Sequence, residues 1–386
     1  MSKVFFDEVV DFIRSWYDTD QPIPLHAPVF HGNERKYVLE TIDSTFVSSV
    51  GEYVTKFESM VADYTGATEA VATSNGTVAL QIALLVSGVR HGEEVITQPL
   101  TFVATSNAIA HVGAIPIYVD CSLSTMGLSP DSLNEFLETN AINIKGESYN
   151  RKTGRRLAAC IPMHTFGHVV EIENIRVICD RFNIPLIEDA AESLGSYCGD
   201  THTGLIGDVG VLSFNGNKTI TTGGGGMIIT KNKQFALRAK HLTTTAKRPH
   251  QWEFFHDEVG YNFRLPNLNA ALGCAQMERL PDLLRDKREL AYAYRDFFKD
   301  TKVRFFEERE GTTSNYWLNS IILSDRAERD EFLSFTNKKN IATRPIWTLM
   351  NKLPMYQKCQ TTPLPNAEWF EDRVVNIPSS PRVKNV

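Results

Sequence analysis

Ser213-Phe214-Asn215-Gly216-Asn217-Lys218-Thr219-Ile220-Thr221-Thr222, followed by four glycines at 223–226, places one lysine between two segments that favour turns. An apolar run over 209–214 precedes it and another, 227–229, follows the glycines, which is typical of two buried strands. A lysine held between such strands cannot carry its charge out to water. Burial disfavours the ammonium, and the neutral amine is a nucleophile toward aldehydes. Taken alone, the segment also fits a solvated lysine beside a flexible linker, so the rest of the chain must decide.

Strand-like and helical patterns alternate on the N-terminal side of this stretch. Strands are expected at 70–73, 94–98, 115–119, 157–163 and 184–188, and helices at 78–86, 102–111, from 130 onward and 172–181. Ser129 and Pro130 fit the N-cap and first position of the helix that starts there. Residues 143–156 are expected to form a loop or hairpin. This alternation predicts an α/β fold with a mostly parallel central sheet flanked by helices on both faces.

The two ends of the chain follow other patterns. Residues 4–17 have the apolar spacing of an amphipathic helix, which packs on the body of the protein or on another subunit. Residues 243–259 resemble a mobile, polar connection, and long helices over 267–279 and 283–298 with a few short strands suggest a smaller α+β C-terminal domain. We therefore expect an N-terminal helix and connector (1–30), a large domain (31–259) and a small domain (260–386).

Composition narrows the classes of protein. The 386 residues, 42% hydrophobic and 22% charged, suit a two-part globular protein. A net charge of -6 without a basic stripe argues against a nucleic-acid partner. Six scattered cysteines without a CxxC pair indicate reduced thiols, not a disulfide framework or a zinc site. Acidic residues within the first apolar stretch and the lack of a membrane-length apolar run predict a cytoplasmic protein with no membrane partner.

Three further features join the lysine at the same edge of the predicted sheet. Ser74-Asn75-Gly76-Thr77 leads from a strand into a helix, whose free N–H groups can bind an anion such as phosphate. Asp189 ends a buried strand, where ligands of α/β sheets bind, and can keep a pyridine nitrogen protonated. Phe102 follows another strand and can stack on a flat ring. Each feature also has an ordinary structural explanation. Residues 74–77 can form a simple strand-to-helix turn, Asp189 can cap the turn that follows it, and Phe102 can pack in the core.

Together these four features are the components of a site for pyridoxal 5′-phosphate (PLP). No GxGxxG sequence follows a strand, so a dinucleotide such as NAD fits poorly. His164 and His168 have i, i+4 spacing but lack a nearby third ligand, and we expect no metal site.

The sequence resembles the fold-type I, PLP-dependent sugar aminotransferases of the DegT/StrS group from about residue 25 to its end. The shared segments are Asn75-Gly76-Thr77, Thr101-Phe102-Val103-Ala104-Thr105, Glu188-Asp189-Ala190-Ala191, Ser213 to Gly223, and Gly260-Tyr261-Asn262-Phe263-Arg264. Phe46-Val47-Ser48-Ser49-Val50-Gly51 and Thr343-Arg344-Pro345-Ile346-Trp347 resemble a narrower branch. Its members aminate nucleotide-linked 4-keto-6-deoxy-N-acetylhexosamines on the route to legionaminic-type nonulosonic acids. The resemblance thus implies a role in nonulosonic acid or surface polysaccharide biosynthesis.

This resemblance implies a role for each matching residue. Lys218 would bond to the cofactor aldehyde and Asp189 would hold the pyridine nitrogen, while Phe102 would stack on the ring. The remaining cofactor contacts would be Glu192 near the 3-hydroxyl, and Gly76, Thr77 and Ser213 at the phosphate. Asn262 would reach the phosphate of the neighbouring subunit, which implies a homodimer with shared active sites. Ser49, Arg344 and Trp347 would face the sugar nucleotide.

The implied reaction is a ping-pong transamination. L-glutamate would leave as 2-oxoglutarate, and pyridoxamine 5′-phosphate would be the intermediate that aminates C4 of the ketosugar. Related dehydratases carry histidine where Lys218 stands, so the lysine favours transamination. Gly224 and Val169 depart from the glutamate and proline of many members, which bears on substrate fit. The alternatives are 3-amination or dehydration of a nucleotide ketosugar, and a non-catalytic regulator with this fold, although no DNA-binding module precedes residue 25.

Overall fold

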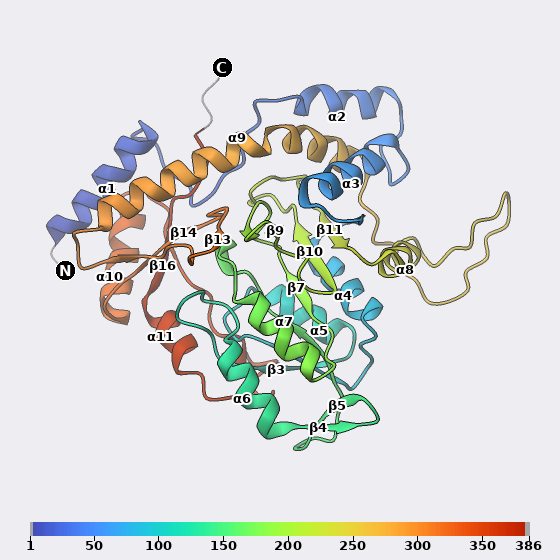
Figure 1. Cartoon of the computed structure of the whole chain (residues 1–386). Coiled ribbons are helices and arrows are strands. Elements are labelled where there is room, and N and C mark those ends of the chain that lie inside the picture. Colours follow the sequence, from blue (N-terminus) through green and yellow to red (C-terminus); the bar gives the residue numbers. More distant parts are fainter. Residues whose placement is uncertain (1–2, 383–386) are drawn as a thin grey trace.

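The computed structural model describes residues 3–382 and is built around a central sheet (Figure 1). Four strands lie in the order β1 (Glu69–Thr73), β11 (Gly226–Thr230), β10 (Val209–Ser213) and β7 (Ile187–Asp189). Three more lie in the order β3 (Ile115–Tyr118), β2 (Glu94–Thr97) and β6 (Leu157–Ile161). Parallel bridges from Cys160 to Leu186 and from Met163 to Asp189 join the two groups at β6 and β7.

Of these strands, β11 alone runs opposite to all the others. The connection that leads into it from β10 is the lysine loop, residues 214–225, which contains no helix. Adjacent parallel strands are usually joined through a crossover helix, whereas antiparallel neighbours need only a loop. The predicted mostly parallel α/β sheet is confirmed, with this one reversal.

Helices cover both faces of the sheet. One face packs on α4 (Gly76–Val86), α5 (Val103–His111) and α8 (Lys233–Thr243), and the other on α3 (Glu52–Thr65) and the first half of a long helix, α9. Beyond β7, α6 (Pro130–Asn140) and α7 (Ile172–Arg181) extend the core. Ser129 caps α6 as expected, because its side chain accepts a hydrogen bond from the N–H of Ser132. A short hairpin, β4 (Ala141–Ile144) with β5 (Glu147–Asn150), follows α6.

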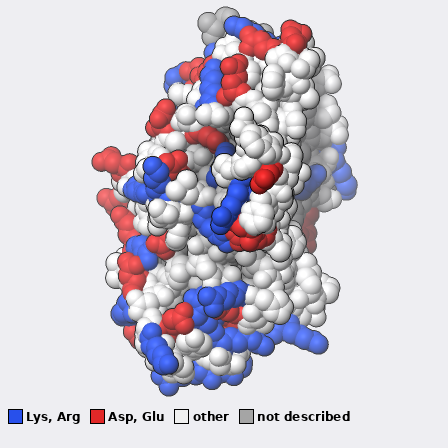
Figure 2. Space-filling view, turned by 90° about the vertical axis from the view of Figure 1, so that its right-hand side faces the viewer, with Lys and Arg blue, Asp and Glu red and all other residues white. Residues whose placement is uncertain are grey.

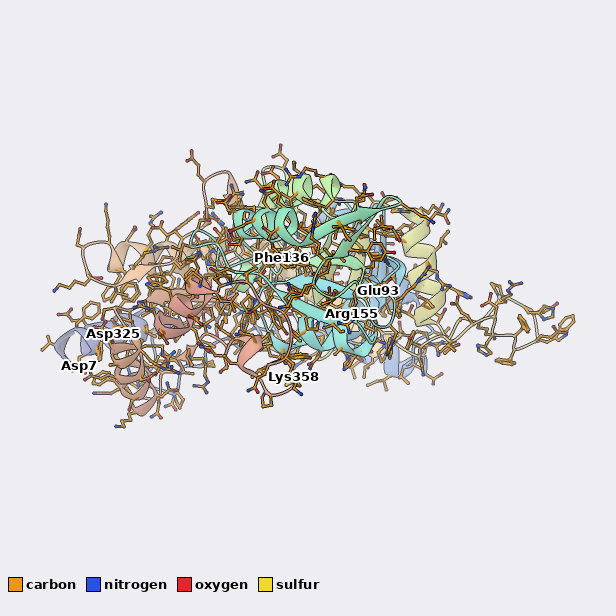
Figure 3. All side chains as sticks on the ribbon, turned by 90° about the horizontal axis from the view of Figure 1, so that it is seen from below. Asp7, Glu93, Phe136, Arg155, Asp325 and Lys358 are labelled. Atoms are coloured by element: carbon orange, nitrogen blue, oxygen red, sulfur yellow. The ribbon has the colours of Figure 1, made fainter. Side chains whose placement is uncertain are left out.

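The C-terminal part forms a second, antiparallel sheet. Its order is β12 (Arg304–Phe305), β14 (Asn319–Ile322), β16 (Val374–Ile377) and β15 (Arg344–Pro345), next to α10 (Arg326–Lys338) and α11 (Pro365–Arg373). The N-terminal helix α1 (Lys3–Tyr17) packs here through Phe6, Val9 and Ile13. Asp7 of α1 and Asp325 before α10 accordingly lie at the same end of the molecule (Figure 3). The small remaining elements are α2 (Glu34–Asp43), β8 (Tyr197–Cys198), β9 (Thr201–His202) and β13 (Thr312–Thr313).

Two expectations for the region after residue 243 were wrong. The helices expected at 267–279 and 283–298 are one helix, α9 (Asn267–Phe298), which continues through Pro281. Proline removes one helical hydrogen bond, but buried Leu280 and Leu283 hold the turns on both sides of it against the core. The connection over 243–259 is also less polar than expected.

That connection projects from the body as an extended loop, seen at the right of Figure 1. Trp252, Phe254 and Phe255 are exposed on it, at 70%, 80% and 56%. The prediction of a polar connection followed from its threonines and charged residues and did not account for these aromatic side chains. On the face that carries the loop, Lys and Arg are interleaved with Asp and Glu (Figure 2). Across residues 3–382, no helix has both the length and the apolar character needed to cross a bilayer.

The glycine run lets β11 approach the start of α4 closely. A Cβ at Gly226 would lie 2.5 Å from the carbonyl oxygen of Asn75 and 2.8 Å from the nitrogen of Gly76. Both atoms belong to the backbone, so neither can move aside cheaply. Gly224, two positions earlier, has nothing nearer than an oxygen of Ser74 at 3.9 Å.

We expect Gly226→Ala to lower the free energy of unfolding by about 1–3 kcal/mol, because the added methyl forces β11 and the start of α4 apart. Gly224→Ala, the matched control, should change it by less than about 0.5 kcal/mol. Urea-induced unfolding followed by tryptophan fluorescence measures both. Equal stability of the two variants would contradict the close approach.

Lys287 of α9 is fully buried and joins this helix to two C-terminal segments. Its Nζ donates to the carbonyl oxygens of Trp317 (3.1 Å) and Ser379 (2.7 Å). Burial lowers the pKa of Lys287 from 10.5 to about 7, and the neighbouring Asp286 opposes this shift. Between these two values the unfolded chain binds the proton more tightly, so stability rises with pH over this range.

Lys287→Met removes both hydrogen bonds at every pH. It also removes the free-energy cost of protonating a buried amine. We expect the stability lost by the variant to be larger at about pH 9.5 than at about pH 6.5, since the wild-type protein bears the charging cost only at the lower pH. Urea unfolding of both proteins at the two pH values measures this difference. A loss that does not change with pH would show that Lys287 does not titrate in this range.

Candidate active site

A cavity of about 330 Å³ opens at the carboxyl ends of the parallel strands. Eight of the residues singled out from the sequence line it together: Gly76, Thr77, Phe102, Asp189, Glu192, Ser213, Lys218 and Trp347. They come from the start of α4, the start of α5, the end of β7, the end of β10, the loop after it, and the segment after β15. The fold thus brings into one place residues that are up to 271 positions apart in the sequence.

The start of α4 forms one end of the cavity. Asn75 is its N-cap, in extended conformation, and its side chain accepts a hydrogen bond from the N–H of Val78 at 3.0 Å. The positive end of the helix dipole and the remaining N–H groups of the first turn are directed toward the cavity, where an anion is favoured. Gly76 lies against Ser213, and a Cβ there would be 3.0 Å from the Ser213 Cβ.

Asp189 ends β7 and is 2% exposed. Its Oδ2 accepts a hydrogen bond from Thr105 Oγ1 at 2.7 Å, and its Oδ1 accepts one from the N–H of Ala191 at 3.2 Å. Burial raises the pKa of Asp189, while the hydrogen bond from Thr105 acts in the opposite direction. A buried carboxylate with so little solvation favours a cationic partner.

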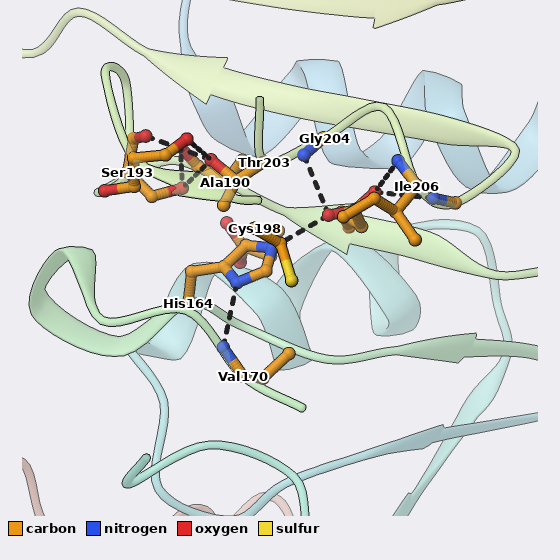
Figure 4. Close-up of polar contacts among 12 residues, drawn as sticks. His164, Val170, Ala190, Ser193, Cys198, Thr203, Gly204 and Ile206 are labelled. Atoms are coloured by element: carbon orange, nitrogen blue, oxygen red, sulfur yellow. Dashed lines mark hydrogen bonds and ion pairs between the residues drawn. The ribbon is translucent and has the colours of Figure 1, made fainter. Parts of the chain in front are cut away.

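The residue before it, Glu188, anchors the end of β7 through partners that include His164, Gly204 and Ile206, which are labelled in Figure 4. Its carboxylate accepts hydrogen bonds from the N–H groups of Gly204 (2.8 Å), Ile206 (2.7 Å) and Gly207 (2.5 Å), and pairs with His164 Nε2 at 2.9 Å. Burial alone would raise the pKa of Glu188, but the bond to His164 and the backbone donors lower it overall. Glu188 therefore stays ionised and anchors the strand that carries Asp189.

Lys218 extends into the cavity with a side chain that is 12% exposed, and its Nζ lies 3.1 Å from Glu192 Oε1. The other oxygen of Glu192 accepts the N–H of Phe166 at 2.9 Å. Burial raises the pKa of Glu192 to about 7, although the positive charge of Lys218 opposes this shift. The inward-pointing lysine predicted from the sequence is therefore confirmed over the alternative of a solvated loop lysine, since this amine is enclosed and paired.

Aromatic rings form the mouth of the cavity. Phe102 is 49% exposed, and its ring centroid lies 6.3 Å from that of Trp347. Trp347 in turn packs on Phe166, with ring centroids 4.7 Å apart. A half-exposed phenylalanine beside a buried carboxylate has an open face, on which a flat ring can stack.

Three of the residues assigned from the resemblance lie outside this cavity. Ser49 is in the turn before α3, and Asn262 is exposed, near Arg264, whose Nε donates to it at 3.3 Å. Arg344 is exposed, and its guanidinium donates to Asn337 and to the carbonyl of Thr343. Within one chain, none of the three contributes to the wall of the cavity, so their roles stay predictions.

Several other lining residues were assigned no role of their own from the sequence. Asn75, Asn215 and Asn217 line the cavity from the two loops, and Trp317 lines it from the segment before β14. The Asn75 cap could have been recognised, because asparagine before a helix is a known signal. Trp317 gave no local signal, since only the folded chain brings it next to Lys218.

The histidines with i, i+4 spacing have other partners. His164 is hydrogen-bonded to Glu188, and the ring of His168 packs edge-on against Phe306 and Tyr316. Burial lowers the pKa of His168 to about 3, so this side chain is neutral. His241, Asp257 and Glu258 lie close enough together to bind a metal ion. Their carboxylates already pair with arginines, however: Asp257 with Arg248 and Glu258 with Arg238.

Comparison with known proteins identifies the family. Residues 29–385 match the DegT/DnrJ/EryC1/StrS aminotransferase family. This chain belongs to that family. It is 35% identical over 365 residues to a GDP-perosamine synthase of Vibrio cholerae, covering 93% of this chain and 94% of the relative. It is 32% identical over 361 residues to that of Caulobacter vibrioides, covering 92% and 93%. The aminotransferase TlmJ of Streptoalloteichus hindustanus has the same fold, with a TM-score of 0.84, 26% identity and 93% of both chains covered.

The protein is thus a PLP-dependent sugar aminotransferase of fold type I. The cavity fits PLP on its own evidence. Gly76 leaves the space that a Cβ would fill at an anion-binding helix start, Asp189 is a buried carboxylate suited to a protonated ring nitrogen, and Phe102 offers an open ring face.

Thr105→Val should weaken PLP binding about tenfold, because Asp189 then loses its shortest hydrogen bond and more of it is protonated at neutral pH. Titration of the enzyme with PLP, followed by visible absorbance, measures the affinity. Thr105→Ser keeps the hydroxyl and should bind within about twofold of wild type. Wild-type affinity in Thr105→Val would show that this hydroxyl does not support Asp189.

Proposed function

We propose that this enzyme transfers the amino group of L-glutamate to C4 of a nucleotide-linked 4-keto-6-deoxy-N-acetylhexosamine, in the formation of a legionaminic-type nonulosonic acid. The main support for transamination is the enclosed Lys218 amine. It lies in the same cavity as the anion-binding start of α4 and the buried Asp189. The cavity is also open at its aromatic mouth, where a large substrate can enter.

The choice of C4 is supported by the relatives. The two GDP-perosamine synthases make a 4-amino sugar on a nucleotide, and they cover more than nine-tenths of this chain. The N-acetylhexosamine is supported by the resemblance of the Ser49 and Arg344–Trp347 segments to the narrower branch. Trp347 lines the mouth of the cavity beside Phe102, a suitable place for a sugar ring. The nucleotide, UDP or GDP, stays open.

PLP, when bound, supplies an aldehyde and an electron-withdrawing ring that stabilises negative charge on the carbon next to the transferred nitrogen. Each polar residue then has a defined task. Asp189 holds a proton on the ring nitrogen, and the N–H groups at the start of α4, with Thr77 and Ser213, bind phosphate. Lys218 moves protons at Nζ to and from the reacting carbon, with Glu192 next to it as a hydrogen-bond partner.

The proposal includes a homodimer with shared sites. Asn262 is exposed and outside its own cavity, as a residue that serves a neighbouring subunit would be. Apolar Phe46, Val47 and Val50, next to Ser49, are 58%, 45% and 65% exposed, and an exposed apolar group of this kind is typical of a protein interface. A cytoplasmic location fits the supply of nucleotide sugars and glutamate.

A panel of UDP- and GDP-linked 4-ketosugars, incubated with L-glutamate and PLP, tests this function. We expect 2-oxoglutarate and a sugar whose new C4–N bond is seen by NMR, with the N-acetylated substrates preferred. Lys218→Ala should lose at least about 1,000-fold in turnover and the visible absorbance of the bound cofactor. Lys240→Ala, an exposed lysine paired with Glu58, is the matched control and should keep both.

Three results would contradict the proposal. An amino group at C3 would favour 3-amination, and loss of a hydroxyl without nitrogen transfer would favour dehydration. No turnover with any substrate, despite bound PLP, would favour a ligand-binding regulator.

A further inference from the structure

The indole of Trp317 lies directly against the amine of Lys218. The Nζ atom is 3.9 Å from the centroid of the ring, and Trp317 is only 5% exposed. A cation this close to a tryptophan face is attracted to the ring, most strongly where water is excluded. Glu192 Oε1 also lies 3.1 Å from the same nitrogen. The amine of Lys218 is therefore held by both a carboxylate and an aromatic face.

The orientation of this indole is fixed by the lysine loop itself. Its Nε1–H donates to the carbonyl of Asn217, the residue before Lys218, at 2.7 Å. The backbone N–H of Trp317 donates to Asn315 Oδ1 at 2.8 Å, and the amide of Asn315 donates to Thr219 Oγ1 at 3.2 Å. The residues on both sides of Lys218 are thus bonded to the segment that carries the ring, so the ring and the amine keep their relative position.

The other charged groups around the amine are few. Asp189 and Glu192 are the nearby carboxylates, and the charge of Lys218 acts on both. Lys287 donates to the carbonyl of Trp317, and the ring of His26 lies 6.5 Å from the indole. Burial, with the charges of Lys287 and Lys218, lowers the pKa of His26 well below its usual value, so His26 is neutral at physiological pH.

We propose that Trp317 is a positioning residue for Lys218. Together with Glu192 it forms a cradle that holds the Lys218 ammonium beside the reacting atoms whenever the amine is not bonded to the cofactor. A transaminase lysine is released from the cofactor in each half-reaction. Its amine must then stay close to the reacting carbon, to which it transfers a proton. The indole attracts the amine without adding a competing acceptor, and prevents the side chain from turning out of the cavity. The inference rests on Lys218 being the reactive amine, but not on which sugar is aminated.

Chemical labelling of Lys218 tests the cradle without relying on turnover. The enzyme is loaded with pyridoxamine 5′-phosphate, a form in which Lys218 is not bonded to the cofactor. It is then treated briefly with an amine-acylating reagent near neutral pH. Peptide mass spectrometry then gives the rate for each lysine. In Trp317→Leu we expect Lys218 to react about 2- to 30-fold faster than in wild type, since its amine is no longer held against the ring by the cation–π attraction.

Trp347→Leu is the matched control, because it opens the same cavity but removes a ring that packs on Phe102 and Phe166. It should change the Lys218 rate by less than about twofold. An equal rise in both variants would mean that the ring only limits access, and would overturn the inference. So would a wild-type rate in Trp317→Leu.

Buried Lys287 reports on folding in the same digest. If it stays unlabelled, the Trp317→Leu result stands as measured. If it becomes labelled, Trp317→Phe decides: it keeps a weaker aromatic face, so a rise of about 2- to 3-fold supports the cradle and an unchanged rate overturns it. Turnover by Lys218→Ala would instead show that Lys218 is not the reactive amine, on which the inference rests. Amination at C3 by an active enzyme would contradict the proposed function but leave this inference intact.

Discussion

The active site depends on one close backbone approach, where β11 and β10 meet the start of α4. Gly226 lies against the backbone of Asn75 at a distance that leaves no room for a larger residue, and Gly76 lies tightly against Ser213. This contact sets the helix N-terminus beside the strand end from which the lysine loop departs. The loop then has only a short path to β11, so Lys218 is held over the carboxyl edge of the sheet instead of extending into water.

Much of this arrangement could be predicted because its signals are local. The helix at 172–181 was predicted to the residue, and the strands at 70–73 and 209–214 to within one residue at each end. Gly76, Asp189 and Lys218 each follow or precede a strand in a way that assigns them to one edge of the sheet. Common placement at the carboxyl edge follows from parallel topology alone, without knowledge of any side-chain contact.

The rest depends on contacts between distant parts of the chain. Trp317 is 99 residues from Lys218, and Thr105 is 84 residues from Asp189, so no window of sequence pairs them. The continuity of α9 through Pro281 comes from packing on both sides of the proline, which outweighs the local signal. The roles of Ser49, Arg344 and Asn262 were predicted on a different basis. Their assignment came from resemblance, and a single chain cannot show contacts that a neighbouring subunit or a substrate would complete.

The charges of the cavity, taken together, define what it can bind. Asp189 and Glu192 are both buried carboxylates whose pKa values are raised by burial, and Lys218 is the cation that acts on both. Because Lys218 pairs directly with Glu192, the charge of Asp189 is not neutralised by a direct ion pair with this lysine, and a cationic group of a ligand is favoured next to it. The start of α4, at the other end of the cavity, favours negative charge. A ligand that satisfies both ends must be anionic at one end, cationic at the other and flat where it passes Phe102. A pyridinium ring with a phosphate group has this distribution, and a free sugar does not.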